Sequence, residues 1–563
     1  MTFSEYPYVR PNIDEIKDQL TKLVDAFKDA TTPFSQILIV KQFHDIYDEV
    51  DSMSQLCYIR HSLNTSDDFY KAEQEYLDEV GPQIQEFVVN FKQVLLQSKF
   101  RKDLEKEFGT LLFKQAELEN KVFKPDIIPL LQQENKLNTE YSRLISSAKI
   151  EFEGNIYNLS QMRKFTTDLN RDTRKRASLA TSKWFESHEA EFDKLYDDMV
   201  KIRHEMALKL GYKNFIQLAY DRFQRVDYDA KDVKGYRDQV YQEIVPFVAS
   251  LVERKKARLG LDELKHYDLG LTFLSGNPTP KGDKVFQVEK ARKMYEEMSP
   301  ETHKFFEFMV QNELMDLDSK PNKDGGGYCT FIPKFDSPFI FANFNGTSGD
   351  VDVLTHEAGH AFQVYMSKDL LPEYRWPTME AAEIHSVSME FLAWPWIHYF
   401  FEEDTPKYKF DHLSGAIEFL PYGVLVDEFQ HQVFENPNRT PEERKALWRE
   451  LEKKYLPFKD YSEDPFLDKG TYWFRQSHIF TAPFYYIDYT LAQVLAFQFW
   501  NLSQENYEEA FNKYLELCKL GGSYSFVGLV QKAKLDNPFQ SGTIKRTMEP
   551  IKAYLNSIDD KKL

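Results

Sequence analysis

Two histidines four residues apart constrain this chain more than any other feature. They are His356 and His360 in the run His-Glu-Ala-Gly-His, with Glu357 between them. A helix places side chains four residues apart on one face, where both imidazoles can bind one tetrahedral metal ion. Glu357 is rotated by about 100° from His356 on such a helix and can reach a water molecule at the metal. The motif therefore predicts a helix here and a zinc site suited to peptide hydrolysis.

A hydrolytic zinc site needs a third protein ligand and keeps its fourth position open. Downstream, Thr378 marks the expected start of a second helix, which carries Glu383 and Glu390 on one face, two turns apart. Apolar neighbours indicate that this helix is buried, where an ionised carboxylate persists only if it is paired or bound to metal. Spacing alone leaves Glu380 and His385 open as rival ligands.

The pattern His-Glu-x-Gly-His, followed by Glu-x-x-Ser-x-x-x-Glu, resembles the thimet oligopeptidase and oligoendopeptidase F family of zinc metallopeptidases. The resemblance implies that Glu383 joins His356 and His360 as the third ligand of one Zn²⁺ per chain. Glu357 then serves as the general base. The second glutamate of the pattern maps onto Glu390, for which we expect a hydrogen bond to the outer ring nitrogen of a ligand histidine.

Ala358 stands where many relatives carry phenylalanine, which favours the oligoendopeptidase F branch of the family. This position points away from the metal on a helix, so the difference is expected to alter packing more than catalysis.

A second match to the family lies near the carboxyl end. In related enzymes a histidine, a proline and tyrosines three residues apart bind the substrate backbone and stabilise the tetrahedral intermediate. The resemblance implies that His478 and Tyr489 are catalytic residues that stabilise the oxyanion and that Tyr486 contacts substrate. Tyr486 and Tyr489 are three apart on a helix expected to open after Pro483, so both hydroxyls can face one cleft.

The apolar run from Phe339 to Phe344 has strand character. A strand with one free edge can pair with an extended peptide through backbone hydrogen bonds, which suits an enzyme that accepts varied sequences. We therefore expect Ala342 and Phe344 to contact substrate, while an ordinary buried strand fits the run equally well. The glycine-rich run at 324–328 lacks the ending of a phosphate loop and is expected to form a turn or lid near the cleft mouth.

Composition excludes several other classes of protein. The net charge of -19 disfavours nucleic acid as a partner, and three widely separated cysteines argue against a disulfide framework. The chain has no run of 18 apolar residues and no basic start followed by an apolar segment, which predicts a cytoplasmic protein without a membrane partner. The oligomeric state is left open.

Helical periodicity dominates the chain and predicts a mainly α fold. Near the amino terminus, Asn12 is expected to cap a helix whose apolar stripe comprises Ile13, Ile16, Leu20, Leu23, Val24 and Phe27. The resemblance implies a two-lobed helical metallopeptidase of the zincin type, with a deep central substrate channel and a small β-sheet near the active site. Residues 1–165 then form a helical lobe over the channel, and residues 166–563 form the catalytic region.

Spacing alone predicts a metal hydrolase. The resemblance implies a zinc-dependent endopeptidase that cleaves short unfolded oligopeptides, because a folded domain cannot thread through such a channel to a recessed metal. A related helical zinc carboxypeptidase or dipeptidyl carboxypeptidase is the main alternative. It would need a carboxylate clamp, and no residue can be assigned to one. A non-catalytic peptide-binding protein is a further alternative, against which the intact Glu357 and both histidines argue.

Overall fold

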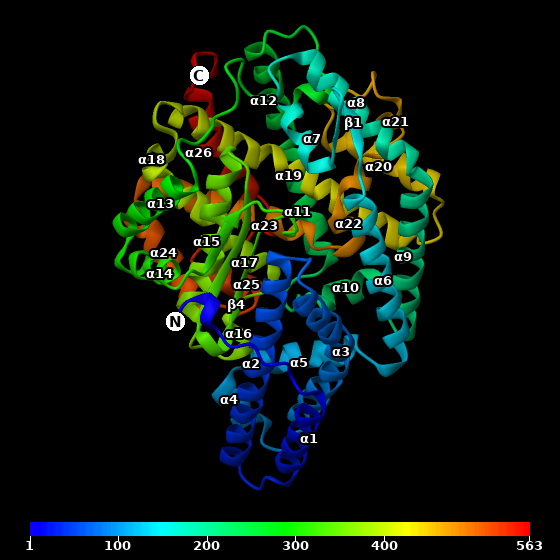
Figure 1. Cartoon of the computed structure of the whole chain (residues 1–563), viewed down its shortest axis with the longest axis vertical. Coiled ribbons are helices and arrows are strands. Elements are labelled where there is room, and N and C mark those ends of the chain that lie inside the picture. Colours follow the sequence, from blue (N-terminus) through cyan, green and yellow to red (C-terminus); the bar gives the residue numbers. More distant parts are fainter.

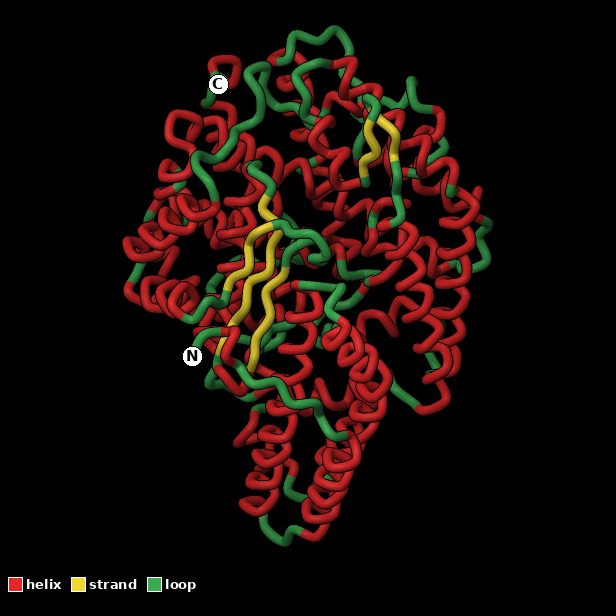
Figure 2. The backbone as a smooth tube through the Cα atoms, in the orientation of Figure 1, coloured by secondary structure: helices red, strands yellow, loops and turns green.

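A computed structural model describes the backbone of residues 1–563 and the side chains of all of them except Pro82. Helices make up most of the molecule, and a small sheet lies among them (Figures 1 and 2), as the mainly α class predicted. The first helices are α1 (Ile13–Asp29), α2 (Pro33–Leu63), α3 (Asp68–Leu96), α4 (Arg101–Phe108) and α5 (Thr110–Val122).

Helices α1 to α5 share a core of their own. The side chain of Asn12 accepts hydrogen bonds from the backbone N–H groups of Asp14 and Glu15, so α1 begins where the capping signal predicted. Its buried stripe packs against α2 and α3, and this core also takes in Tyr374 from the distant carboxyl-terminal part of the chain. These helices project at one end of the molecule, blue in Figure 1. The division of the chain at residue 165 stays a prediction.

The next helices are α6 (Ile128–Ser146), α7 (Leu159–Thr166), α8 (Arg171–Ser187), α9 (Glu189–Lys209), α10 (Phe215–Arg222), α11 (Ala230–Glu243), α12 (Val245–Arg258), α13 (Lys284–Met298) and α14 (Pro300–Gln311). Helix α9 ends before Gly211, whose φ of +88° is the left-handed conformation that favours glycine after a helix. Strands β1 (Ile150–Phe152) and β2 (Asn155–Tyr157) form an antiparallel hairpin between α6 and α7.

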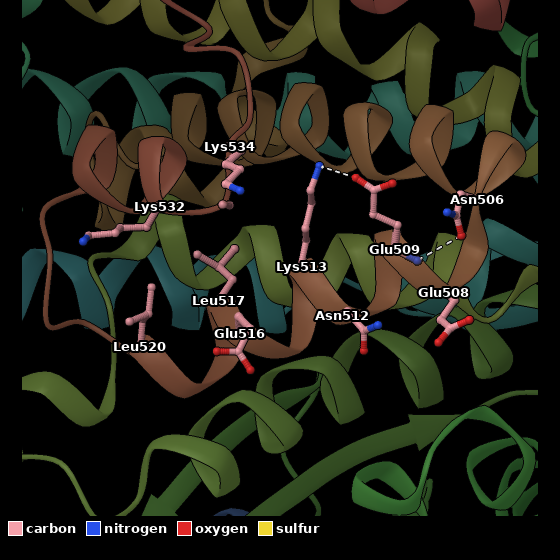
Figure 3. A pocket seen from close by; sticks show the side chains of 11 residues that line it. Asn506, Glu508, Glu509, Asn512, Lys513, Glu516, Leu517, Leu520, Lys532 and Lys534 are labelled. Carbon is pink, nitrogen blue, oxygen red and sulfur yellow. Dashed lines mark hydrogen bonds and ion pairs between the residues drawn. The ribbon is translucent and has the colours of Figure 1, made fainter.

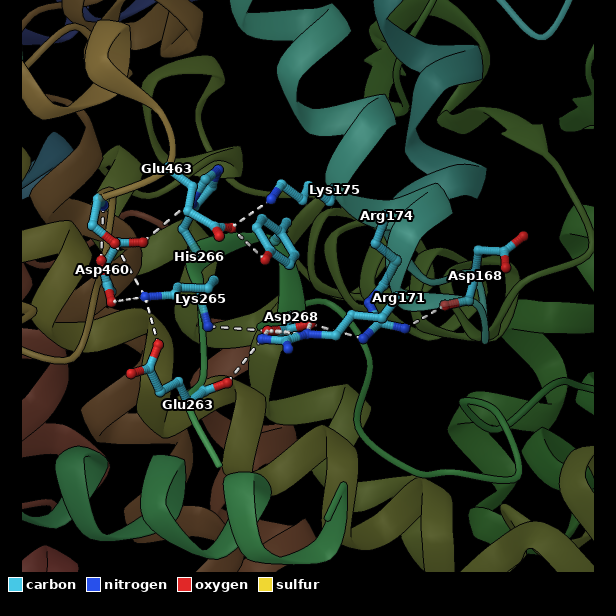
Figure 4. Close-up of polar contacts among 12 residues, drawn as sticks. Asp168, Arg171, Arg174, Lys175, Glu263, Lys265, His266, Asp268, Asp460 and Glu463 are labelled. Atoms are coloured by element: carbon cyan, nitrogen blue, oxygen red, sulfur yellow. Dashed lines mark hydrogen bonds and ion pairs between the residues drawn. The ribbon is translucent and has the colours of Figure 1, made fainter. Parts of the chain in front are cut away.

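A buried ionic cluster joins α8 to two loops (Figure 4). The carboxylate of Asp268 is fully buried and accepts hydrogen bonds from Arg174 at 2.8 Å and from Arg171 at 2.7 Å. Lys265, three residues before Asp268, pairs with Asp460 at 2.7 Å. Because a buried carboxylate is stable only when its charge is compensated, this cluster ties the loop around residue 268 to α8 and to the loop at residue 460.

The larger sheet has three strands in the order β3 (Met315–Asp318), β5 (Ser337–Phe344) and β4 (Tyr328–Ile332). Strand β5 is the middle strand, parallel to β3 and antiparallel to β4. Figure 2 shows this sheet in yellow within the helical body.

The prediction that β5 offers a free edge to substrate is wrong. Along β5, Phe344 pairs with Asp318 of β3, and the carbonyl oxygen of Ala342 accepts a hydrogen bond from the ammonium group of Lys323 at 2.6 Å. The strand is buried from Ser337 to Ala342, and a continuous buried apolar run is typical of a strand with neighbours on both sides. The edge strands are β3 and β4.

The remaining helices are α15 (Ser348–Ser367), α16 (Pro372–Arg375), α17 (Met379–Leu392), α18 (His398–Phe401), α19 (Thr405–Glu435), α20 (Pro441–Tyr455), α21 (Pro465–Asp468), α22 (Ser477–Thr481), α23 (Tyr486–Glu505), α24 (Tyr507–Leu520), α25 (Phe526–Lys532) and α26 (Thr543–Ser557). Helix α17 lies between α15 and α23 and packs extensively against both, while α15 also packs on β5 (Figure 1). Within the described part of the chain, no helix has both the length and the apolar character needed to cross a membrane.

Candidate active site

Helix α15 carries the His-Glu-Ala-Gly-His run, as predicted. Its amino end is held by Asp350, whose carboxylate accepts hydrogen bonds from the backbone N–H groups of Asn345 at 2.8 Å and Gly346 at 2.7 Å. An acidic side chain in the first turn also interacts favourably with the helix dipole. Because His356 and His360 are four residues apart, their rings lie on one face of α15, with centroids 5.1 Å apart.

A close approach between α15 and α17 brings the third ligand candidate to the histidines. Oε2 of Glu383 lies 3.4 Å from Nε2 of His356 and 3.5 Å from Nε2 of His360. Ligand atoms bound tetrahedrally to zinc at 2.0–2.1 Å are about 3.4 Å apart. The two distances from Glu383 match that spacing, and all three ligand atoms lie within 4.8 Å of one another. Among the described residues, His356, His360 and Glu383 form a cluster whose ligand atoms lie close enough together to hold one metal ion.

The two rival ligands lie elsewhere. Glu380 is buried and accepts a hydrogen bond from the hydroxyl of Tyr228 at 3.0 Å. His385 is fully buried beside Cys518, with Nδ1 3.5 Å from the thiol sulfur, and burial lowers the pKa of its imidazole to about 3. Neither side chain belongs to the group formed by the two histidines and Glu383.

Glu390 binds the outer nitrogen of His356, at 2.7 Å from Nδ1, as the sequence led us to expect. Its other oxygen lies 2.8 Å from Nε2 of His412, a residue that the sequence did not single out. Burial raises the pKa of Glu390, but the hydrogen bonds from both histidines outweigh that effect and hold the pKa at about 2. Glu390 is therefore an anion that accepts from both imidazoles.

Trp394 sets the direction of these hydrogen bonds. Its indole N–H donates to Nδ1 of His412 at 3.1 Å, and an indole nitrogen can only donate. His412 must then donate to Glu390 through Nε2, and His356 donates to Glu390 through Nδ1. This tautomer leaves the Nε2 lone pair of His356 free for a metal ion.

Glu357 lies beside the glycine-rich loop. A methyl group at Gly327 would stand 3.5 Å from Oε1 of Glu357 and 3.4 Å from a backbone oxygen of β5, which places this loop in van der Waals range of the carboxylate. Glu357 is 7% exposed, and burial raises the pKa of its carboxyl above the ordinary value despite the opposing effect of His356 and His360. A carboxylate with a raised pKa is a better proton acceptor near neutral pH.

A third segment, at the start of α23, brings tyrosines to the ligand group. The hydroxyl of Tyr485 donates to Oε1 of Glu383 at 2.7 Å, the oxygen that does not face the histidines. Sequence reasoning missed Tyr485 because it favoured the pair of tyrosines three apart. The available signal was the spacing of four between Tyr485 and Tyr489, whose rings lie 4.9 Å apart.

Tyr489 and His478 lie side by side, with the hydroxyl of Tyr489 3.4 Å from Nε2 of His478. The amide nitrogen of Gln476 lies 2.8 Å from Nδ1 of His478, and its amide oxygen accepts from Tyr422. Since an amide nitrogen can only donate, His478 carries its proton on Nε2 and points it at Tyr489. The proton of the Tyr489 hydroxyl is then free to be donated elsewhere. Burial lowers the pKa of His478, in keeping with a neutral ring.

Tyr486 faces the same group, with its ring centroid 5.0 Å from that of His478 and 5.5 Å from that of Tyr489. Its ring also packs edge-on against Tyr422. Its role as a substrate contact stays a prediction, as do the roles of Ala342 and Phe344.

One surface groove is separate from this site. A cavity of about 510 Å³ runs along α24 and α25 (Figure 3), where Lys513 pairs with Glu509 at 3.0 Å. None of the predicted site residues lines it. Its charged groups are solvated surface residues, and we assign it no role.

Comparisons with known proteins agree with this arrangement. The family profile described as Peptidase family M3 matches residues 165–549, and the profile described as Peptidase M3 N-terminal domain matches residues 3–123. An oligoendopeptidase F homolog of Mycoplasma genitalium is 22% identical over 351 residues, which cover 56% of this chain and 56% of that relative. The match thus spans little more than half of that protein's length.

Solved structures match over the full length. A structure of Pz peptidase A with an inhibitor has a TM-score of 0.96 and is 51% identical, and the match covers 100% of both chains. A protein of Bacillus anthracis described as an oligoendopeptidase F has a TM-score of 0.91 and is 48% identical, covering 100% of this chain and 99% of that one. Oligoendopeptidase F of Enterococcus faecium, at 18% identity and a TM-score of 0.66, shares the fold over 98% of both chains. With its profile matching more than half of its residues, the chain belongs to peptidase family M3, the family of the metallo-oligopeptidase enzymes.

Proposed function

We propose that this protein is a zinc-dependent endopeptidase that hydrolyses internal bonds of short unfolded peptides, with His356, His360 and Glu383 as the ligands of one Zn²⁺. The observation that carries the proposal is the spacing of the three ligand atoms, 3.4 and 3.5 Å from the carboxylate to the two imidazoles, which fits tetrahedral zinc. A bound zinc ion would lower the pKa of its water molecule and polarise the carbonyl group of the peptide.

The chain's own side chains supply the proton transfers. Glu357 accepts the proton of the attacking water and returns it to the departing amine, a task for which burial and its raised pKa suit it. Tyr489 donates its free hydroxyl proton to the developing oxyanion, and His478 supports Tyr489 by donating to its oxygen. Tyr485 orients Glu383 by binding its other oxygen.

We also propose that the helices of the amino-terminal lobe limit access to this site. Support comes from Tyr374, which follows α15: its hydroxyl donates to the Phe108 carbonyl and accepts from the Leu112 N–H, both at 2.8 Å. These hydrogen bonds anchor the segment after α15 to α4 and α5. A lobe fixed over the cleft would admit extended peptides and exclude folded proteins. We further propose a cytoplasmic location.

The test uses a peptide capped at both ends. The purified protein should cleave it, lose that activity with a chelator and regain it with zinc. Glu357→Gln should keep stoichiometric zinc yet lose turnover by at least roughly 100-fold, since general base catalysis contributes about that much or more. Full activity of the chelated protein, or of zinc-loaded Glu357→Gln, would overturn the proposal. Cleavage only of peptides with a free carboxyl end would instead favour a carboxypeptidase.

A further inference from the structure

Phe484, directly before Tyr485, has an unusual backbone conformation. Its φ is +71°, in the left-handed region that residues with a Cβ atom rarely adopt. The residue is fully buried, and its ring packs against those of His431 and Phe434. A conformation of this kind costs free energy and persists only where surrounding contacts enforce it.

Two buried side chains hold both polar groups of this residue. The N–H of Phe484 donates to the amide oxygen of Gln430 on α19 at 2.9 Å. The carbonyl oxygen of Phe484 accepts from the guanidinium of Arg225, just beyond α10, at 2.7 Å. The side chain of Arg225 is fully buried and so is Gln430. Three segments that are distant in the sequence therefore meet at one residue, through the two peptide groups that flank its Cα.

Arg225 also binds the first turn of α23, the helix that follows Phe484. The same guanidinium nitrogen donates to the carboxylate of Asp488 in the first turn of α23 at 2.6 Å. The guanidinium lies over the ring of Tyr220, 4.5 Å from its centroid, and over that of Phe223 at 5.1 Å. Arg225 is thus fixed by packing on one side and by charge on the other.

Tyr485 directly follows the left-handed residue. The chain turns at Phe484, and the next side chain places its hydroxyl 2.7 Å from Oε1 of Glu383. Phe223, two residues before Arg225, stacks on the ring of Tyr485 with centroids 6.0 Å apart and planes at 24°. The segment that holds the backbone of Phe484 therefore also supports the ring of Tyr485.

We propose that Arg225 and Gln430 are positioning residues for the reaction: they keep Phe484 left-handed, so that Tyr485 stays bound to Glu383 and the carboxylate keeps its orientation. This inference rests on the proposed function, in which Glu383 is a metal ligand. Neither positioning residue touches substrate, so loss of either should lower kcat and weaken zinc binding while leaving KM nearly unchanged.

The principal variant is Gln430→Met, which keeps the length of the side chain and removes the acceptor for the Phe484 N–H. The matched control is Gln36→Met in the amino-terminal lobe, where a buried glutamine likewise makes one donor and one acceptor contact, to Phe27 and Ser98. At saturating zinc we expect kcat of Gln430→Met to fall about 10–100-fold, the effect typical of lost support for a metal ligand. Gln36→Met should keep the kcat of the unmodified protein.

A double-mutant cycle with Tyr485→Phe separates positioning from general loss of structure. If Gln430 acts through Tyr485, the double variant should be no slower than the slower of the two single variants. Multiplicative losses in kcat, or a Gln430→Met enzyme as active as the control, would overturn the inference. Should Gln430→Met fail to fold, Arg225→Lys replaces it in the same cycle, because lysine keeps a positive charge in the site but lacks the guanidinium nitrogen that donates to the Phe484 carbonyl.

The outcome is distinguishable from failure of the proposed function. If the unmodified protein shows no cleavage that a chelator abolishes, the proposed function fails. If the unmodified protein is a zinc-dependent peptidase and the cycle is multiplicative, the positioning role alone fails.

Discussion

Gly359 of α15 lies directly against the backbone at Ser386 of α17. A Cβ atom at position 359 would stand 2.7 Å from the Cα of Ser386 and 2.7 Å from the carbonyl oxygen of His385. Real side chains do not approach backbone so closely, so only glycine allows the two helices to come this near. The contact explains in physical terms why a glycine stands next to His360: Glu383 reaches the histidines because α15 and α17 touch at this point.

Gly359→Ala should therefore separate the helices and weaken the metal site. We expect zinc affinity to fall at least roughly tenfold, and overpacking should lower the free energy of unfolding by about 1–3 kcal/mol. Gly415→Ala is the matched control, because a Cβ at this helical glycine of α19 would meet nothing within 4 Å. That control should be neutral or gain up to about 1 kcal/mol. Zinc titration and denaturant unfolding measure both effects, and unchanged zinc affinity in Gly359→Ala would contradict the account.

Glu390→Gln tests the support behind His356. The carboxylate faces two donors, Nδ1 of His356 and Nε2 of His412, whereas an amide offers one acceptor and one donor group. One imidazole N–H would lose its partner, and zinc affinity should fall about 10–100-fold. The exposed Glu435 at the end of α19 provides the control substitution Glu435→Gln. Equal zinc affinity in both variants would show that Glu390 does not orient the ligand.

Tyr489→Phe and Tyr486→Phe should affect different kinetic parameters. If Tyr489 donates to the oxyanion, removing its hydroxyl should lower kcat about 100-fold or more with little change in KM. If Tyr486 contacts bound peptide equally in the ground and transition states, its variant should raise KM and keep kcat. Steady-state kinetics with a capped peptide distinguish the two, and an unchanged kcat in Tyr489→Phe would refute the assignment.

Low pH should weaken the contact between α2 and α16, the short helix that follows α15. Nε2 of His44 lies 3.1 Å from Oε2 of Glu373. Burial raises the pKa of Glu373, but the close contact with His44 and its charge outweigh that effect and lower the pKa from 4.5 to about 2. A carboxyl whose pKa is lower when folded stabilises the protein above the unfolded pKa, and this stabilisation is lost as pH falls from 4.5 towards 2.

Glu373→Gln isolates that contribution. At pH 6 the variant should be less stable than the unmodified protein by about 1–3 kcal/mol, because one partner of a partly buried pair is left uncompensated. The difference should shrink as pH falls below 4.5. Urea unfolding of both proteins at pH 6 and at pH 3 measures it, and a difference that is constant with pH would rule out the ionic origin.

Several local features could be predicted from sequence because their causes are local. Asn12 caps α1, and the His-Glu-Ala-Gly-His run is helical, because capping and helical periodicity depend on neighbours within one or two turns. The strand at Phe339–Phe344 was also recognisable, but not its neighbours, since strand order depends on pairing with segments elsewhere in the chain.

The residues that support the site could not be predicted from the sequence, for the same reason. His412 and Trp394 lie 22 residues or fewer from Glu390 but on other helices, and no spacing rule links them to a ligand. Tyr485 was passed over in favour of the tyrosines three apart, since its contact with Glu383 joins segments 102 residues apart and no local spacing shows it.

The amino-acid sequence alone predicted the type of site: two imidazoles and a carboxylate on one helix, with further carboxylates on the next. Ligand type and helical periodicity can be recognised from the residues and their spacing. Only the tertiary packing determined which of these carboxylates lies beside the histidines. Glu380, Glu383 and Glu390 share one helix, and the packing of this helix against α15 and α23, closest to α15 at Gly359, decides where they lie. Glu383 faces the histidines, Glu390 lies behind His356 and Glu380 contacts Tyr228. The physical reason is that metal binding depends on distances of a few ångströms between separate segments, and those distances arise only when the helices pack.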